Sequence, residues 1–115
     1  MLVDSHCHLN FEQLSSQLDD VVARARAAGV GHMLTIGTKL REFTAVRTIA
    51  EGYDDIHCSV GVHPHEAESE NDEVSTAKLI ELAAHRSYAR CGSGYHRHPA
   101  GRIRAGALYR GYTLL

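Results

Sequence analysis

The stretch MLVDSHCHLN, residues Met1–Asn10, sets the fold hypothesis from which the rest of the chain is interpreted. A short apolar run, Met1–Val3, is typical of a buried strand and leads through Asp4 into two histidines, His6 and His8. Successive side chains of a strand point to opposite faces, so residues two apart share one face. We therefore expect both imidazoles on one side of the strand end. Imidazole is the commonest metal-binding side chain, so this pair predicts half of a metal site.

Strand and helix periods alternate along the chain after this stretch. We expect strands at residues 1–4, 32–37 and 56–61, a loop at 5–11, and helices at 15–28, 39–51 and 74–84. Ser15 or Ser16 is the expected cap of the first helix, and Gly29 its end. Strands that alternate with helices indicate parallel βαβ units, and Val- and Ile-rich strands that are apolar on both faces suit burial under helices. The predicted fold class is α/β.

Four histidines follow the carboxyl ends of predicted strands. His6 and His8 follow the first strand, and His63 and His65 follow the third. Parallel α/β folds bind their ligands at this edge of the sheet. We expect His6 and His8 to bind metal, and His63 and His65 to lie in the substrate-binding region. There His63 contacts a substrate phosphate or orders a water, and His65 shapes the loop.

The remaining histidines and two of the cysteines are expected to have no part in the functional site. His32, His57 and His85 have no partner at ligand spacing, so we expect them to be structural or on the surface. Cys7 would point away from the flanking histidines and pack in the interior. Cys58 lies inside a predicted strand and is expected to be a small core residue.

Length and composition are ordinary for one soluble domain of 115 residues. No apolar run is long enough to span a bilayer, and the amino terminus does not resemble a signal peptide. We therefore expect a cytoplasmic protein with no membrane partner.

Charge divides the chain near residue 85. Residues 1–85 contain all 14 acids and six Lys or Arg, a net charge of −8. Residues 86–115 contain six Arg, no Lys and no acid, a net charge of +6. We expect two regions: a folded unit at 1–85, and an irregular Arg- and Gly-rich tail at 86–115. The tail is either disordered or a basic nucleic-acid patch.

Three segments of the folded unit resemble the amino-terminal part of the TatD family. These are VDSHCHL at 3–9, AAGV at 27–30 and SVGVHPH at 59–65. TatD proteins are metal-dependent DNases and hydrolases of the amidohydrolase superfamily. The resemblance implies a TIM-type (β/α)8 barrel with a divalent two-metal site, Mg²⁺ or Mn²⁺, that cleaves DNA phosphodiester bonds. It also implies that His6 and His8 bind one of the two ions.

The resemblance implies a truncated form as well. A (β/α)8 barrel needs about 250 residues, so the folded unit corresponds to the first three βα units. The family's bridging Glu is absent, and Ser93 stands about where it would fall, so we assign no catalytic residue. The tail is interpreted as a frameshifted segment. We expect weak metal binding, little catalysis and self-association through the incomplete barrel.

Two other functions remain open from the sequence. One is another amidohydrolase-type metal enzyme that acts on a small amide or phosphoester, because the His-x-His start is shared across that superfamily. The other is a non-catalytic fragment that binds nucleic acid through its Arg-rich tail.

Overall fold

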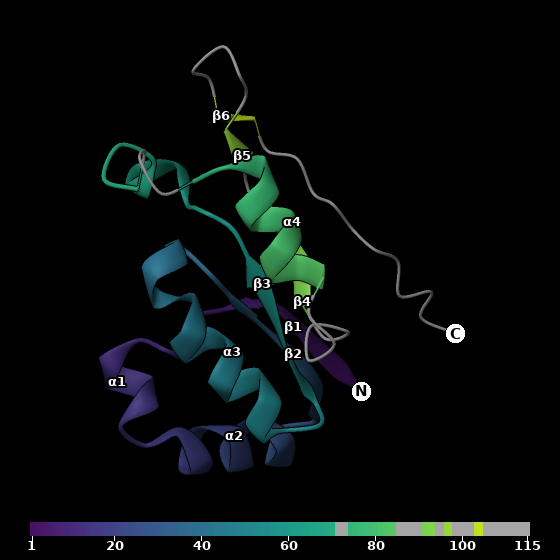
Figure 1. Cartoon of the computed structure of the whole chain (residues 1–115). Coiled ribbons are helices and arrows are strands. Elements are labelled where there is room, and N and C mark those ends of the chain that lie inside the picture. The colour runs from purple at the N-terminus through teal and green to yellow at the C-terminus, as the bar shows by residue number, and fades with distance from the viewer. Residues whose placement is uncertain (71–73, 85–90, 94–95, 98–102, 105–115) are drawn as a thin grey trace.

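The computed structural model describes residues 1–70, 74–84, 91–93, 96–97 and 103–104. Within these ranges a parallel sheet has the strand order β1-β2-β3-β4 (Figure 1). Its strands are β1 (Leu2–Cys7), β2 (Val30–Ile36), β3 (Ile56–Val60) and β4 (Cys91–Ser93). A separate antiparallel pair consists of β5 (His96–Arg97) and β6 (Ile103–Arg104). Spatial order in the parallel sheet follows chain order, so the predicted α/β class and parallel βα units are confirmed.

Helices connect these strands. They are α1 (Glu12–Ser15), α2 (Leu18–Ala27), the 3₁₀ helix η1 (Leu40–Glu42), α3 (Phe43–Gly52), the 3₁₀ helix η2 (Pro64–Glu66) and α4 (Thr76–Ala84). The expected second and third helices are thus present as η1 with α3 and as α4. Among the described helices, none is long and apolar enough to cross a membrane.

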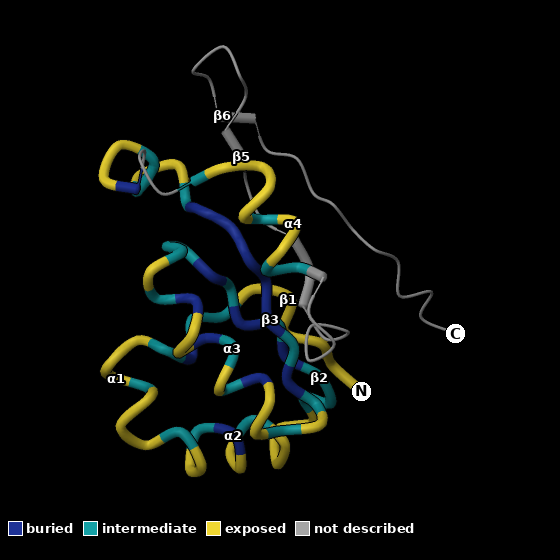
Figure 2. Tube along the Cα trace, viewed as in Figure 1, coloured by how far each residue is buried: buried dark blue, intermediate teal, exposed yellow. Residues whose placement is uncertain are grey.

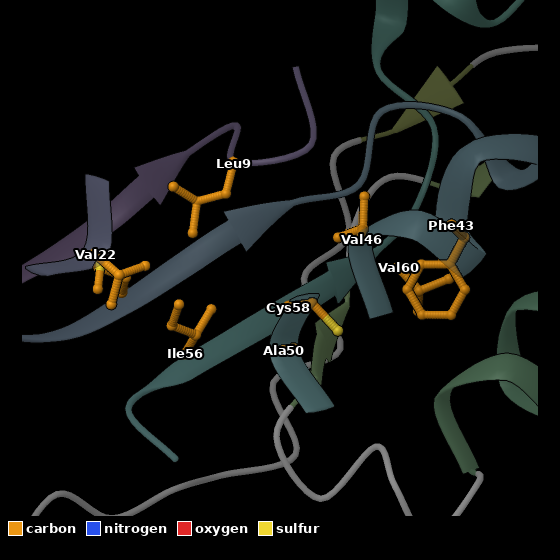
Figure 3. Packing of buried hydrophobic residues seen from close by; sticks show 9 residues of the cluster. Leu9, Val22, Phe43, Val46, Ala50, Ile56, Cys58 and Val60 are labelled. Carbon is orange, nitrogen blue, oxygen red and sulfur yellow. The ribbon is translucent and has the colours of Figure 1, made fainter. Parts of the chain in front are cut away.

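One hydrophobic core lies between the sheet and its helices. Ile56 of β3 points into it, together with Val22 of α2 and Val46 of α3 (Figure 3). Met33 of β2 belongs to the same core cluster. Leu79 and Leu82 of α4 pack against the same cluster. β-branched and other apolar side chains at every second strand position suit this half-buried surface. Cys58 is fully buried within β3, as the sequence predicts.

Gly29 lies in the connection between α2 and β2. Gly29 follows α2 with a φ of +89°, a conformation that L side chains rarely adopt. Its N–H donates to the Arg26 carbonyl at 3.0 Å, and its own carbonyl accepts from the Leu2 N–H at 2.9 Å. The predicted helix end at Gly29 is confirmed, and this residue also fixes where β1 begins beside β2.

Two local predictions are wrong. β1 continues to Cys7, so His6 lies within the strand and not in the expected loop, because pairing with β2 extends to Thr35. The helix expected at 15–28 is divided into α1 and α2. Gln17 precedes α2 as its cap residue without a side-chain hydrogen bond, so neither Ser15 nor Ser16 caps it.

The first strand is more exposed than its sequence indicates. Met1, Leu2 and Val3 are 90%, 63% and 52% exposed. Figure 2 shows the chain next to its N-terminus in the exposed colour. β1 lies at the end of the sheet order with β2 as its strand neighbour, whereas β2 and β3 each have a strand on both sides. The expectation of strands buried on both faces is therefore wrong for β1.

The predicted division near residue 85 falls mostly outside the described residues. Within the 86–115 segment, β4 pairs in parallel with β3, and Cys91 and Ser93 lie opposite Cys58 and Val60. A fourth strand is therefore present at the position where the βα pattern calls for one.

An ion pair joins α2 to the start of β3. The Arg26 guanidinium donates through Nε and Nη2 to the two Asp55 carboxylate oxygens, both at 2.7 Å. This bond holds the pKa of Asp55 below its ordinary value, against the opposing effect of burial. The guanidinium also lies 5.6 Å from the Tyr53 ring centroid.

We expect this pair to make stability depend on pH. The folded-state pKa of Asp55 is depressed, so its contribution is present above about pH 4 and is lost as pH falls through the folded pKa. Asp55→Asn should lower the free energy of unfolding by about 1 kcal/mol at pH 7, since both partners are partly exposed. Urea unfolding of both proteins at pH 7 and pH 3 measures this, with Glu68→Gln as an exposed carboxylate control. A difference that is equal at the two pH values would contradict the assignment.

Candidate functional site

The two amino-terminal histidines lie side by side at the carboxyl end of β1. Their ring centroids are 5.1 Å apart, with the planes at 81°. Asp4 Oδ1 accepts the His6 backbone N–H at 3.1 Å, a local hydrogen bond near the carboxyl end of β1. The His8 ring stacks on Phe11, with centroids 4.7 Å apart and planes at 11°. One imidazole is therefore packed against an aromatic ring, and the other is exposed beside it.

The surroundings of His8 suit a cation. Its Nδ1 is buried, and within the described part of the chain it has no hydrogen-bond partner. Buried polar atoms without partners are rare, and a bound ion is one of the recognised explanations. The fit is incomplete, since the described residues contain no group of three His, Cys, Asp or Glu side chains able to hold a metal. The pair thus offers two nitrogen donors and needs others to complete a site.

Cys7, between the two histidines, does not join them. Its Sγ donates to the Leu34 carbonyl at 3.3 Å, and the side chain packs against the core. Burial, and secondarily the charge of Asp4, raises the pKa of the Cys7 thiol to about 12. A thiol with this pKa is neutral near pH 7, so packing is its role, as the sequence predicts.

The second pair of histidines follows β3. The ring centroids of His63 and His65 are 4.8 Å apart, with the planes at 71°. His63 Nδ1 accepts the His65 backbone N–H at 3.2 Å and so caps η2. The His63 backbone N–H donates to the Thr38 carbonyl at 2.8 Å. The capping bond orients the His63 ring, and β2 separates this pair from His6 and His8 along the same carboxyl edge of the sheet.

Buried Glu70 fastens the histidine loop to the loop after β2. The Glu70 side chain is 2% exposed. Oε2 accepts the Leu40 N–H at 2.9 Å, and Oε1 pairs with Arg41 Nε at 2.9 Å. Nearby, Lys39 Nζ lies 3.2 Å from a Glu42 oxygen and 3.8 Å from a Glu66 oxygen. We call Glu70, Leu40 and Arg41 the Glu70 clasp.

Sequence reasoning missed the Glu70 clasp. Glu70 stood within a polar, acidic stretch that is ordinarily solvated, and its partners lie about 30 residues earlier. No local pattern distinguishes it from Glu68, which is exposed.

Close backbone contacts hold the rest of the carboxyl edge. The Gly37 N–H donates to the Ser59 carbonyl at 3.1 Å and to its Oγ at 3.2 Å. A Cβ at Gly37 would come within 2.5 Å of the Ser59 carbonyl oxygen. Buried Thr35 accepts the Leu9 N–H through Oγ1 at 3.1 Å, which ties the segment after His8 to β2. The loops that carry both histidine pairs thus start from a rigid framework.

The other predicted residues lie elsewhere. The backbone of Ser93 lies at the carboxyl end of β4, opposite Val60. His32 and His57, for which the sequence indicated no partner, have ring centroids 5.7 Å apart. His85 lies outside the described residues.

Comparison with known proteins agrees with this geometry. A family model described as "TatD related DNase" matches residues 3–102. The chain is 36% identical over 100 residues to a protein named 3'-5' ssDNA/RNA exonuclease TatD from Cronobacter sakazakii, covering 84% of this chain and 38% of that protein. It is 35% identical over 92 residues to the uncharacterized metal-dependent hydrolase YabD of Bacillus subtilis, covering 80% and 36%. The chain thus spans less than two fifths of these relatives.

A solved structure shares the fold. The crystal structure of YJJV, a TatD homologue from Escherichia coli K12, superposes with a TM-score of 0.67 and 30% identity. The superposition covers 75% of this chain and 33% of that protein. The described α/β units therefore correspond to part of a TIM-type barrel.

A side chain at Gly37 should destabilise the packing of β2 against β3 at the carboxyl edge of the sheet. In Gly37→Ala, the added Cβ meets a backbone oxygen that cannot rotate away, so we expect a loss of roughly 1–3 kcal/mol in unfolding free energy. Gly52→Ala is the matched control, because a Cβ there meets nothing within 4 Å. Urea denaturation compares the two variants, and an equal effect of both would show that the contact is unimportant.

Loss of the Glu70 clasp should loosen the histidine loop. Glu70→Ala leaves the Leu40 N–H and the Arg41 guanidinium without their buried acceptor, which should cost roughly 2–3 kcal/mol. Amide hydrogen exchange should also become faster across residues 61–70. Glu68→Ala, at an exposed neighbouring position, is expected to change stability by less than about 0.5 kcal/mol. Unchanged exchange in Glu70→Ala would argue against the clasp.

Proposed function

Because the chain belongs to the TatD related DNase family, we propose that residues 1–85 supply the first three βα units of a metal-dependent hydrolase that cleaves nucleic-acid phosphodiester bonds. The observation that carries this proposal is the His6–His8 pair at the carboxyl end of β1, in which the buried Nδ1 of His8 has no hydrogen-bond partner among the described residues. Relatives named as a single-stranded DNA and RNA exonuclease and as a metal-dependent hydrolase support the substrate class and the need for a metal.

His6 and His8 hold the metal ion in this proposal. A divalent ion bound there polarises a phosphoryl oxygen and lowers the pKa of water, which is the chemistry that phosphodiester hydrolysis requires. The stack of His8 on Phe11 keeps that ring from turning, so one donor is oriented before the ion arrives. Mg²⁺ and Mn²⁺ prefer oxygen donors, and two imidazoles alone hold them weakly.

His63 and His65 contact the substrate in this proposal. Since His63 Nδ1 accepts the His65 N–H, the Nε2 side of the His63 ring remains the side for an approaching phosphate oxygen. The exposed His65 ring beside it adds a second N–H donor. The Glu70 clasp and the Thr38 contact keep this pair at the carboxyl edge, where phosphates bound near the metal would pass.

Self-association is a further part of this proposal. The exposed apolar side chains Leu2 and Val3 lie on β1, at the end of the sheet order, and exposed Met1 directly precedes them. An exposed apolar strand of this kind pairs readily with another chain. A second copy of the chain is the partner that we propose.

Manganese binding tests the metal assignment directly. We expect the purified chain to bind Mn²⁺ weakly, and His6→Ala/His8→Ala to lower the affinity at least about tenfold. His65→Ala is the matched control and should leave Mn²⁺ affinity unchanged. Water proton relaxation measures the bound fraction, and circular dichroism checks the fold of each variant. Equal affinities in the parent chain and the double variant would refute the assignment.

Cleavage of end-labelled single-stranded DNA in Mn²⁺ provides the second readout. With two donors for one ion, we expect little or no cleavage by this chain. Cleavage that disappears in His6→Ala/His8→Ala would mean that the chain assembles a working site, for instance by association of copies. Hydrolysis of small amides with no effect on DNA would instead favour a different amidohydrolase-type activity.

A further inference from the structure

A third pair of histidines lies towards the amino ends of the strands, away from the carboxyl edge that carries the other two pairs. His32 belongs to β2 and His57 to β3, and their ring centroids are 5.7 Å apart with the planes at 34°. The register pairs Leu34 with His57, so His32 lies two residues earlier on the neighbouring strand. Alternation along each strand places both histidines on one face of the sheet.

This face is opposite the helix-covered core. Met33 and Ile56, which alternate with the two histidines, are 3% and 0% exposed and belong to the core cluster. His32 and His57 are only half-buried. They also lie towards the amino ends of their strands, whereas His6 and His63 lie at the carboxyl ends. The pair is therefore separate from the proposed hydrolase site.

The separation of the two rings fits a shared metal ion. A Zn–N bond of about 2.0–2.1 Å places each ring centre about 3.2 Å from the ion, so two ligating rings have centres about 5–6 Å apart. The observed 5.7 Å lies in this interval. Neighbouring positions offset by two residues on adjacent strands are about 8 Å apart at their Cα atoms, so the rings converge from their backbones.

The environment of His32 gives independent support. Its Nδ1 is buried and, in the described part of the chain, has no hydrogen-bond partner, the same condition as His8 Nδ1. Asp55 is close enough for the charge of His32 to contribute to the low pKa of its carboxyl, behind the larger effect of Arg26. Both Asp55 oxygens bind Arg26, so Asp55 is not itself a ligand, and the two imidazoles are the donors of this site.

We propose that His32 and His57 form a second cation site, which takes an imidazole-preferring ion of the Zn²⁺, Ni²⁺ or Cu²⁺ class. Such ions favour nitrogen donors, in contrast to the oxygen-preferring Mg²⁺ and Mn²⁺. A shared ion cross-links β2 to β3 and stabilises the sheet, because it binds the folded state more tightly than the unfolded chain. The site does not depend on the proposed hydrolase function.

Zinc titration tests this site in a background without the first pair. In His6→Gln/His8→Gln, we expect Zn²⁺ binding to persist by calorimetry. Adding His32→Gln or His57→Gln should weaken it at least tenfold, whereas adding Glu68→Gln, at an exposed position outside both histidine sites, should change the affinity by less than twofold. The urea midpoint should rise with Zn²⁺ in the background protein and in its Glu68→Gln control, but not when His32→Gln is present. Equal effects of His32→Gln and Glu68→Gln would overturn the proposal.

A measurement on the unmutated chain tests the same site without depending on the folding of the variants. Imidazole ¹⁵N resonances of His32 and His57 should shift together at substoichiometric Zn²⁺. Unshifted resonances for these two rings, at Zn²⁺ concentrations that move the His6 and His8 signals, would also overturn the proposal.

Discussion

The parallel pairing of β2 with β3 is the contact on which the other features of this structure depend. Its register runs from Met33 opposite Ile56 to Ile36 opposite Ser59. That register sends one set of side chains beneath the helices and the alternate set to the other face, and a shift by one residue would exchange the two sets. It also brings Gly37 onto Ser59, which sets the starting points of the loops that carry η1 and the histidines. Core, carboxyl edge and histidine placement thus follow from one alignment of two strands.

Much of the fold was predictable because its signals are local. The periodic apolar residues of α3 and α4 and the turn glycine Gly29 each require only a few neighbouring residues to interpret. The wrong predictions concern features decided elsewhere in the chain. β1 continues past Asp4 because β2 offers it partners, and its exposure reflects its position at the end of the sheet order. No residue within 1–10 carries that information.

The candidate site shows the same division between local and distant information. A two-residue spacing predicted that His6 and His8 lie together, since a strand places such residues on one face. The Glu70 clasp and the His32–His57 pair each join segments that are 25 to 30 residues apart, so their detection required the tertiary structure. In both cases a polar residue that looks solvated in the sequence is placed against a specific partner by the fold. The carboxyl edge is consequently rigid in its backbone, although the metal donors among the described residues are few.

The exposed first strand has a consequence for the order of events during synthesis. Strand order equals chain order from β1 to β4, so each new βα unit that leaves the ribosome can dock on the unit before it. β1 precedes the other described strands in the chain, yet Leu2 and Val3 remain exposed beside them. The nascent chain therefore presents an exposed apolar strand for as long as translation of these units lasts. Chaperones that recognise short apolar segments would find such a segment at the start of β1.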